Sequence, residues 1–122
     1  MILVDTSVWI DHFRRPNTLL SKRLEADEVW VHPFVIGELA CGNLSQRREI
    51  LRSLSELRSA PLIAHGDVLH LVEERGLNGL GLGWIDMHLL ASAYAARLPL
   101  WALDKRLVSA ARDLGLQPLS LN

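Results

Sequence analysis

The chain has 122 residues, enough for one domain with its own core and too few for two. Hydrophobic residues make up 49% of it, and no apolar run approaches the roughly 18 residues that a membrane span needs. A formal net charge of −1 excludes nucleic-acid binding through global positive charge alone. We therefore expect a single domain over residues 1–122, without an export signal or membrane contact. Its one cysteine cannot form an internal disulfide, which is consistent with a cytoplasmic location.

Short apolar runs alternate with amphipathic segments through the first half of the chain. The run Ile2–Val4 stops abruptly at Asp5, which is typical of a strand buried on both faces. Helical spacing and turn residues then predict a helix over 8–13, a helix over 19–26, a strand over 29–31, a helix over 33–42 and a helix over 45–57.

The second half continues the alternation on both sides of a loop rich in glycine. The expected elements are a short strand over 61–63, a helix from about 66 to 75, a loop over 77–83, a long helix over 84–98, a strand over 99–103, a helix over 104–114 and a strand over 116–121. No Lys-Ser or Lys-Thr pair follows the loop glycines, so we interpret the loop as a flexible connection. The pattern predicts an α/β fold with a mostly parallel sheet covered by helices on both faces.

Four acids occupy comparable places in this scheme. Asp5 and Asp104 end predicted strands, Glu38 lies on the helix after the second strand, and Asp86 is in the first turn of the long helix. The carboxyl ends of parallel strands meet at one edge of a sheet, where ligands bind in open α/β folds. These positions allow all four acids to converge.

Each acid also has a purely structural explanation. Asp5, Asp86 and Asp104 stand where helices begin, and there an acid is stabilised by about 0.3–1 kcal/mol through unpaired amides and the helix dipole. Glu38 is harder to explain in this way, because its neighbours Ile36 and Leu39 are apolar and we expect it to be buried.

A pocket of carboxylates requires a cation. Two unit charges about 5 Å apart, at an effective dielectric constant of about 20, repel by on the order of 3 kcal/mol. Oxygen ligands without a cluster of His or Cys favour Mg²⁺ or Mn²⁺ over zinc, and these ions bridge to substrate phosphates. The acids therefore indicate metal-assisted phosphoryl chemistry. The five histidines form no competing cluster, although His88 lies two residues after Asp86.

Four motifs resemble those of PIN-domain ribonucleases, specifically the VapC-type toxins of type II toxin–antitoxin systems. They are ILVDTSVWID, VIGELACG, GLGWIDMHLLASA and LWALDKRL, and their order and spacing cover essentially the whole chain. The resemblance implies a PIN-like three-layer α/β/α fold. It also implies an endoribonuclease that depends on Mg²⁺ or Mn²⁺ and cuts single-stranded or looped RNA.

The resemblance assigns the acidic tetrad to Asp5, Glu38, Asp86 and Asp104. Our hypothesis is that Asp5 and Asp86 bind the principal metal while the other two acids complete the pocket. Ser7 resembles a hydroxyl that supports the site, whereas on a purely structural interpretation it or Thr6 caps the first helix.

One position departs from the family pattern. Ala102 stands two residues before the last acid, where the family often has Thr or Ser, and this bears on a supporting hydrogen bond rather than on the fold. Basic side chains that we consider for the RNA backbone are Arg14, Arg15, Lys105 and Arg106, and Trp84 could stack on a base.

The resemblance implies partners as well. Family members commonly form homodimers and bind a small VapB-type antitoxin whose C-terminal segment crosses the active site, and DNA is contacted only indirectly through the antitoxin.

Other interpretations stay open. A catalytically inactive PIN-like module that binds RNA or a partner would share the fold. A HAD-like phosphotransfer protein would need a second Asp where this chain has Ser7, and a receiver domain would place its acids differently. A structural, partner-binding domain is favoured only if the acids are separate helix caps.

Overall fold

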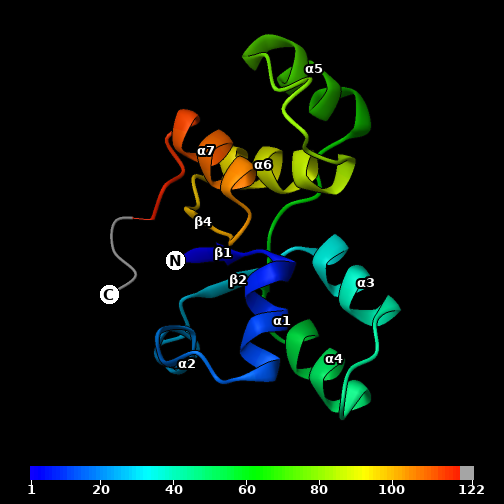
Figure 1. Ribbon diagram of the computed structural model, residues 1–122, viewed down its shortest axis with the longest axis vertical. Helices are drawn as coiled ribbons and strands as arrows, with labels where there is room; N and C mark the ends of the chain where they lie inside the picture. The colour runs from blue at the N-terminus through cyan, green and yellow to red at the C-terminus, as the bar shows by residue number, and fades with distance from the viewer. Residues whose placement is uncertain (119–122) are drawn as a thin grey trace.

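A four-stranded parallel sheet forms the centre of the computed structural model, which describes residues 1–118 (Figure 1). The order of the strands across the sheet is β3-β2-β1-β4. Their bounds are β1 (Ile2–Val4), β2 (Val29–Val31), β3 (Arg58–Ser59) and β4 (Leu100–Trp101). All three strand pairings are parallel, so the carboxyl ends of these strands lie at one edge.

Helices cover both faces of the sheet. They are α1 (Thr6–Arg14), α2 (Thr18–Glu25), α3 (Pro33–Cys41), α4 (Arg47–Ser55), α5 (His65–Arg75), α6 (Trp84–Ala96) and α7 (Lys105–Asp113). Figure 1 shows α1 to α4 on one side of the sheet and α6 with α7 on the other, while α5 lies beyond α6. The three-layer α/β/α fold expected from the sequence is confirmed. None of the helices within residues 1–118 has the length and apolar character to cross a membrane.

The central strand β1 is the most deeply buried element, as its apolar run predicts. Ile2, Leu3 and Val4 are each 1% exposed or less. Leu3 lies between Trp30 of β2 and Leu100 of β4 in the register of the sheet. Burial on both faces and pairing on both sides fix the position at which β1 ends, and therefore fix the backbone of the residue that follows.

Two of the predicted strands differ from the structure. The strand expected over 61–63 is replaced by β3, where Arg58 pairs with Trp30. Pairing ends with the Ala60 N–H, which donates to the Val31 carbonyl at 2.8 Å, because β2 itself ends at Val31 and the chain turns into α3 at Pro33.

The last predicted strand, over 116–121, is only partly within the described residues. Residues 116–118 form no strand, although the Leu116 carbonyl accepts a hydrogen bond from the Leu100 N–H at 2.8 Å. Residues 119–121 of that prediction lie outside the part of the chain that the structure describes.

Candidate active site

Asp5 is held at the end of β1 by its backbone and its side chain. Its N–H donates to the Trp101 carbonyl at 2.9 Å, which extends the pairing of β1 with β4. Its Oδ2 accepts hydrogen bonds from the Ser7 N–H at 3.1 Å and from Ser7 Oγ at 2.6 Å. Asp5 is therefore the N-cap of α1, in place of Thr6 or Ser7. It is also a buried acid, only 7% exposed.

Asp86 reaches the same edge from the first turn of α6. Its Oδ2 accepts a hydrogen bond from the Gly83 N–H at 2.9 Å, which satisfies one of the unpaired amides at the start of this helix. Gly83 is the N-cap and has no side chain to accept from the first helical amides, while the acid in the third helical position accepts from the Gly83 N–H. The loop over 77–83 thus leads directly into the site.

Asp104 is the N-cap of α7 and the partner of Arg106. Its Oδ1 accepts hydrogen bonds from the N–H groups of Arg106 at 2.8 Å and Leu107 at 3.4 Å. The Arg106 guanidinium binds the same carboxylate, with Nη2 3.2 Å from Oδ2 and Nε 3.4 Å from Oδ1. These contacts lower the pKa of the Asp104 carboxyl, and the carboxylate in turn raises the pKa of Arg106.

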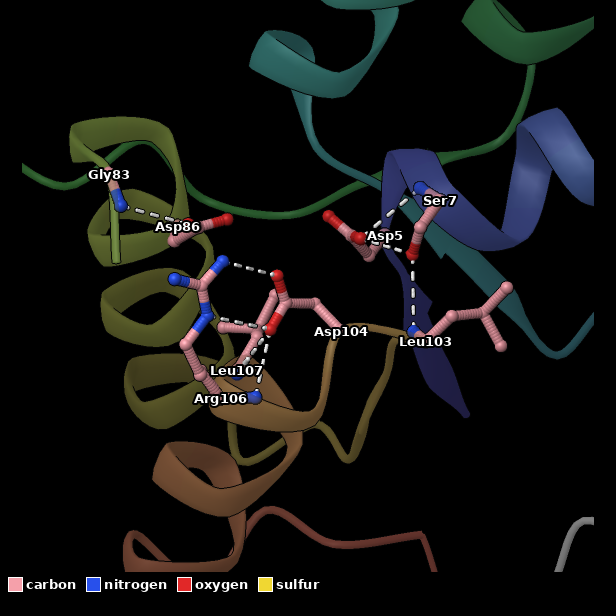
Figure 2. Close-up of polar contacts among 8 residues, drawn as sticks. All are labelled: Asp5, Ser7, Gly83, Asp86, Leu103, Asp104, Arg106 and Leu107. Atoms are coloured by element: carbon pink, nitrogen blue, oxygen red, sulfur yellow. Dashed lines mark hydrogen bonds and ion pairs between the residues drawn. The ribbon is translucent and has the colours of Figure 1, made fainter. Parts of the chain in front are cut away.

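The three aspartates act on one another electrostatically. Burial raises the pKa of Asp86, and the charges of Asp5 and Asp104 raise it further, whereas the Gly83 N–H and Arg106 lower it. Figure 2 shows the carboxylates of Asp5 and Asp86 pointing toward each other, with that of Asp104 beside them. Without an added cation, burial and the neighbouring carboxylates thus disfavour the negative charge of Asp86.

A closed metal cage is absent from the described part of the chain, where no three His, Cys, Asp or Glu side chains are grouped closely enough to hold an ion. The donor set nevertheless fits a hard cation. Asp5 and Asp86 each use one carboxylate oxygen in capping, and within residues 1–118 the other oxygen of each accepts no hydrogen bond. Capping and metal binding are therefore compatible, because they use different oxygens.

Glu38 is positioned differently from the three aspartates. The expectation that it is buried is wrong, because Val35 and Leu39 form the buried face of α3 and Glu38 lies on its exposed face. Its Oε1 accepts a hydrogen bond from Thr6 Oγ1 at 2.6 Å. The carboxylate therefore lies next to the first residue of α1, directly after Asp5.

Ser7 links the end of β1 to the loop that follows β4. Its Oγ donates to Asp5 and accepts a hydrogen bond from the Leu103 N–H at 3.1 Å (Figure 2). Ala102, the position that departs from the family pattern, is 8% exposed and offers no hydroxyl. The contact between Ser7 and Leu103 anchors the loop between β4 and α7, where a hydroxyl at position 102 is absent.

The histidine and tryptophan near Asp86 belong to an aromatic cluster. Trp84 packs against His65 and His88, with ring centroids 4.9 and 4.8 Å apart, and His88 packs on Phe34 at 4.7 Å. His88 is buried, and burial lowers its pKa. These contacts give His88 a structural place in the core, while Trp84 stays 39% exposed beside the site.

Sequence reasoning considered Arg106 only as a possible RNA contact and missed its bond to Asp104. The signal was present as an Asp-Lys-Arg segment, since an arginine two residues after an N-cap acid starts on the same turn of the helix. Of the other basic candidates, Arg14 lines a groove with Glu38 between α1 and α3, and Arg15 and Lys105 are exposed.

Comparisons with known proteins cover nearly the whole chain. Residues 2–113 match the family model described as PIN domain. Two relatives, both named Ribonuclease VapC32, come from Mycobacterium tuberculosis strains CDC 1551 / Oshkosh and ATCC 25618 / H37Rv. Each is 46% identical over 117 residues, which covers 95% of this chain and 94% of the relative.

Proposed function

Because the chain belongs to the PIN domain family, we propose that it is a metal-dependent endoribonuclease toxin, which hydrolyses RNA phosphodiester bonds and is neutralised by a cognate antitoxin. The observation that carries the proposal is the convergence of Asp5, Asp86 and Asp104 at the carboxyl edge of the sheet. Similarity to two proteins named as ribonucleases supports the reaction class.

The acids divide the work of the site. Asp5 and Asp86 hold the cation, Mg²⁺ or Mn²⁺, through the oxygens that capping leaves unused, and Asp104 and Glu38 complete the acidic pocket directly or through water. When bound, the ion supplies charge neutralisation at the phosphate and activation of the attacking water. The protein then needs no covalent nucleophile of its own.

The surrounding residues keep this geometry fixed. Ser7 holds Asp5 through two hydrogen bonds and ties it to the loop after β4. Thr6 holds Glu38 beside the same turn of α1. Since each acid also caps a helix or is bonded to one, its position is set by the backbone before any ion arrives, which is the preorganisation that catalysis requires.

The proposal includes the partners that family membership suggests. The substrate is RNA, the regulator is a small VapB-type antitoxin, and DNA is reached only through that antitoxin. We further propose that residues 1–122 form one PIN domain that assembles as a homodimer and acts in the cytoplasm.

Asp86→Asn tests the proposed reaction. We expect RNA cleavage to fall by more than about a hundredfold, because even the groups that only support metal ligands are worth about 10- to 100-fold. Stability should not fall, since the asparagine oxygen can keep the Gly83 bond and the charge at this position is already disfavoured. The measurement is cleavage of a structured RNA with Mg²⁺, with Mn²⁺ and with EDTA.

Asp67→Asn is the matched control, because Asp67 is an exposed acid in the first turn of α5. It should cleave RNA like the wild type. Cleavage that survives both EDTA and Asp86→Asn would contradict the proposal. If the wild type binds RNA but neither cleaves it nor takes up Mn²⁺ in calorimetry, the inactive RNA-binding module would replace it.

A further inference from the structure

A positive charge already lies among the acids of the proposed metal site. The Arg106 guanidinium contacts both oxygens of Asp104, and Asp86 also attracts it electrostatically. Figure 2 shows the guanidinium bound to the Asp104 carboxylate, with Asp86 next to it. The chain thus supplies its own counter-ion to the acidic pocket.

Gly81 provides the space for this guanidinium. A Cβ at position 81 would lie 2.5 Å from Arg106 Nη1 and 3.2 Å from Arg106 Cδ, so any other residue would displace the side chain. The backbone of Gly81 has a φ of +79°, a conformation that favours glycine. One glycine of the loop over 77–83 therefore has a specific structural purpose, which is to let Arg106 approach Asp86 and Asp104.

Arg106 and a divalent cation cannot occupy the pocket in the same way. The Asp104 oxygens would have to bind the ion, or water on the ion, in place of Arg106. Two cations beside the same carboxylate also repel each other. The ion pair is exposed, at 62% for the Arg106 side chain and 42% for that of Asp104, so the guanidinium can leave it without entering an apolar environment.

We propose that Arg106 is a substrate-positioning residue that competes with the divalent cation for Asp104 and, once displaced, binds an RNA phosphate next to the site. This inference rests on the proposed function. A guanidinium matches two phosphate oxygens as it matches two carboxylate oxygens, so the same side chain suits both partners. Arg106 offsets part of the negative charge of the acids before metal and RNA arrive, and offsets the charge of one RNA phosphate afterwards.

Arg106→Gln is the first test, because glutamine keeps much of the length and removes the charge. Mn²⁺ binding, measured by calorimetry without RNA, should tighten by up to about fivefold, the range that an exposed ion pair allows. The KM for RNA should rise by about fivefold or more, because a phosphate contact is lost. Lys105→Gln, which removes the neighbouring exposed charge, should leave Mn²⁺ affinity unchanged.

Gly81→Ala is a second test that leaves every charge in place. The added methyl group should push Arg106 from Asp104 and shift Mn²⁺ affinity in the same direction as Arg106→Gln. Gly79→Ala controls for backbone strain, since Gly79 has a φ of +75° but its Cβ would meet nothing within 4 Å. It should bind Mn²⁺ like the wild type if circular dichroism shows that both variants are folded.

The outcomes separate this inference from the proposed function. If the wild type and Arg106→Gln bind Mn²⁺ equally well and Asp86→Asn does not bind it, the proposed function stands and the competition is refuted. Absence of Mn²⁺ binding by every variant would refute both. In the wild type, the NMR signal of the Arg106 Nε–H should move when Mg²⁺ is added, and an unchanged signal would also overturn the inference.

Discussion

Asp5 and His32 occupy equivalent places on neighbouring strands, yet their surroundings differ. Each residue directly follows its strand, β1 or β2, and each caps the next helix by accepting a hydrogen bond from the backbone N–H two residues later. Asp5 faces the carboxylates of Asp86 and Asp104. His32 is fully buried and has a hydroxyl as its second partner.

The surroundings of His32 satisfy both of its ring nitrogens. Nδ1 accepts from the Phe34 N–H at 2.9 Å, so Nε2 carries the proton and donates to Ser92 Oγ at 3.0 Å. The Ser92 hydroxyl donates onward to the Pro61 carbonyl at 2.7 Å. Burial, together with the nearby His88, lowers the pKa of His32 to about 4, so the ring is neutral at physiological pH.

Both regions are completed by the same helix, α6. Its first turn supplies Asp86 to the acidic site, and Ser92, six residues and about 9 Å further along, binds His32. The position of a residue at the end of a strand therefore does not determine its chemistry. What determines it is whether the facing helix offers a like charge, which leaves a site incomplete, or a hydroxyl, which closes a hydrogen-bond chain.

Asparagine substitutions at Asp5 and His32 should have opposite effects on activity and stability. Asn caps helices about as well as Asp, so the free energy of unfolding of Asp5→Asn should lie within about 0.5 kcal/mol of that of the wild type. Its rate of RNA cleavage should fall by more than about a hundredfold. His32→Asn should lose about 1–3 kcal/mol in the free energy of unfolding, through a cavity and the lost Ser92 contact, but keep cleavage within a few-fold.

Urea unfolding and RNA cleavage, both measured below the unfolding temperature, test this pair. The distinction between a catalytic role for Asp5 and a structural role for His32 would fail if Asp5→Asn remained active. It would also fail if fully folded His32→Asn were inactive, because His32 would then act on the reaction.

The stability of the protein should depend on pH through the buried His32. The pKa of His32 is about 4 in the fold and near 6.5 when unfolded, so below pH 6.5 the unfolded chain binds a proton that the fold refuses. Stability should therefore be constant above about pH 7 and fall as the pH drops toward 4, by on the order of 1–2 kcal/mol at pH 5 from His32 alone.

The measurement is the urea midpoint at pH 7.5 and pH 5 for the wild type and His32→Asn. Burial lowers the pKa of His12 and His88 too, so both proteins should lose stability in acid, and only the difference between them reports on His32. Equal losses in the two proteins would mean that His32 accepts its proton as easily in the fold as in the unfolded chain.

Ser7→Ala should give the smallest of these effects. It removes the hydroxyl that donates to Asp5 and accepts from the Leu103 N–H, and water can replace part of both contacts at this half-exposed position. We expect a loss of about 1 kcal/mol in the free energy of unfolding and about fivefold in cleavage. Ser7→Thr keeps the hydroxyl and should restore cleavage, and failure to do so would argue against the hydroxyl as the cause.

The sequence predicts the acids at strand ends and helix starts better than it predicts their partners. The apolar run before Asp5 requires burial of β1, and the helical patterns after Asp86 and Asp104 place both acids in first turns or caps. These are local relations along the chain. They were sufficient to predict the edge of the sheet at which the three aspartates meet.

Relations across the chain could not be predicted in the same way. The apolar neighbours of Glu38 do not reveal which face of α3 packs inward, so its exposure and its bond to Thr6 depend on how α1 and α3 meet. The space that Gly81 leaves for Arg106 likewise depends on the approach of a loop to α7. Each of these contacts joins segments whose docking no local pattern specifies.

The bond between Ser7 and Leu103 spans 96 positions of the chain, and it has a consequence for the order of synthesis. β1 is the central strand and the first to be made, whereas β4, which pairs with it, and Asp104 are made after the other strands and most helices. A growing chain therefore cannot assemble the acidic pocket until translation has passed residue 104. Partly synthesised chains that lack β4 therefore lack both Asp104 and the pairing that holds the Asp5 backbone at this edge.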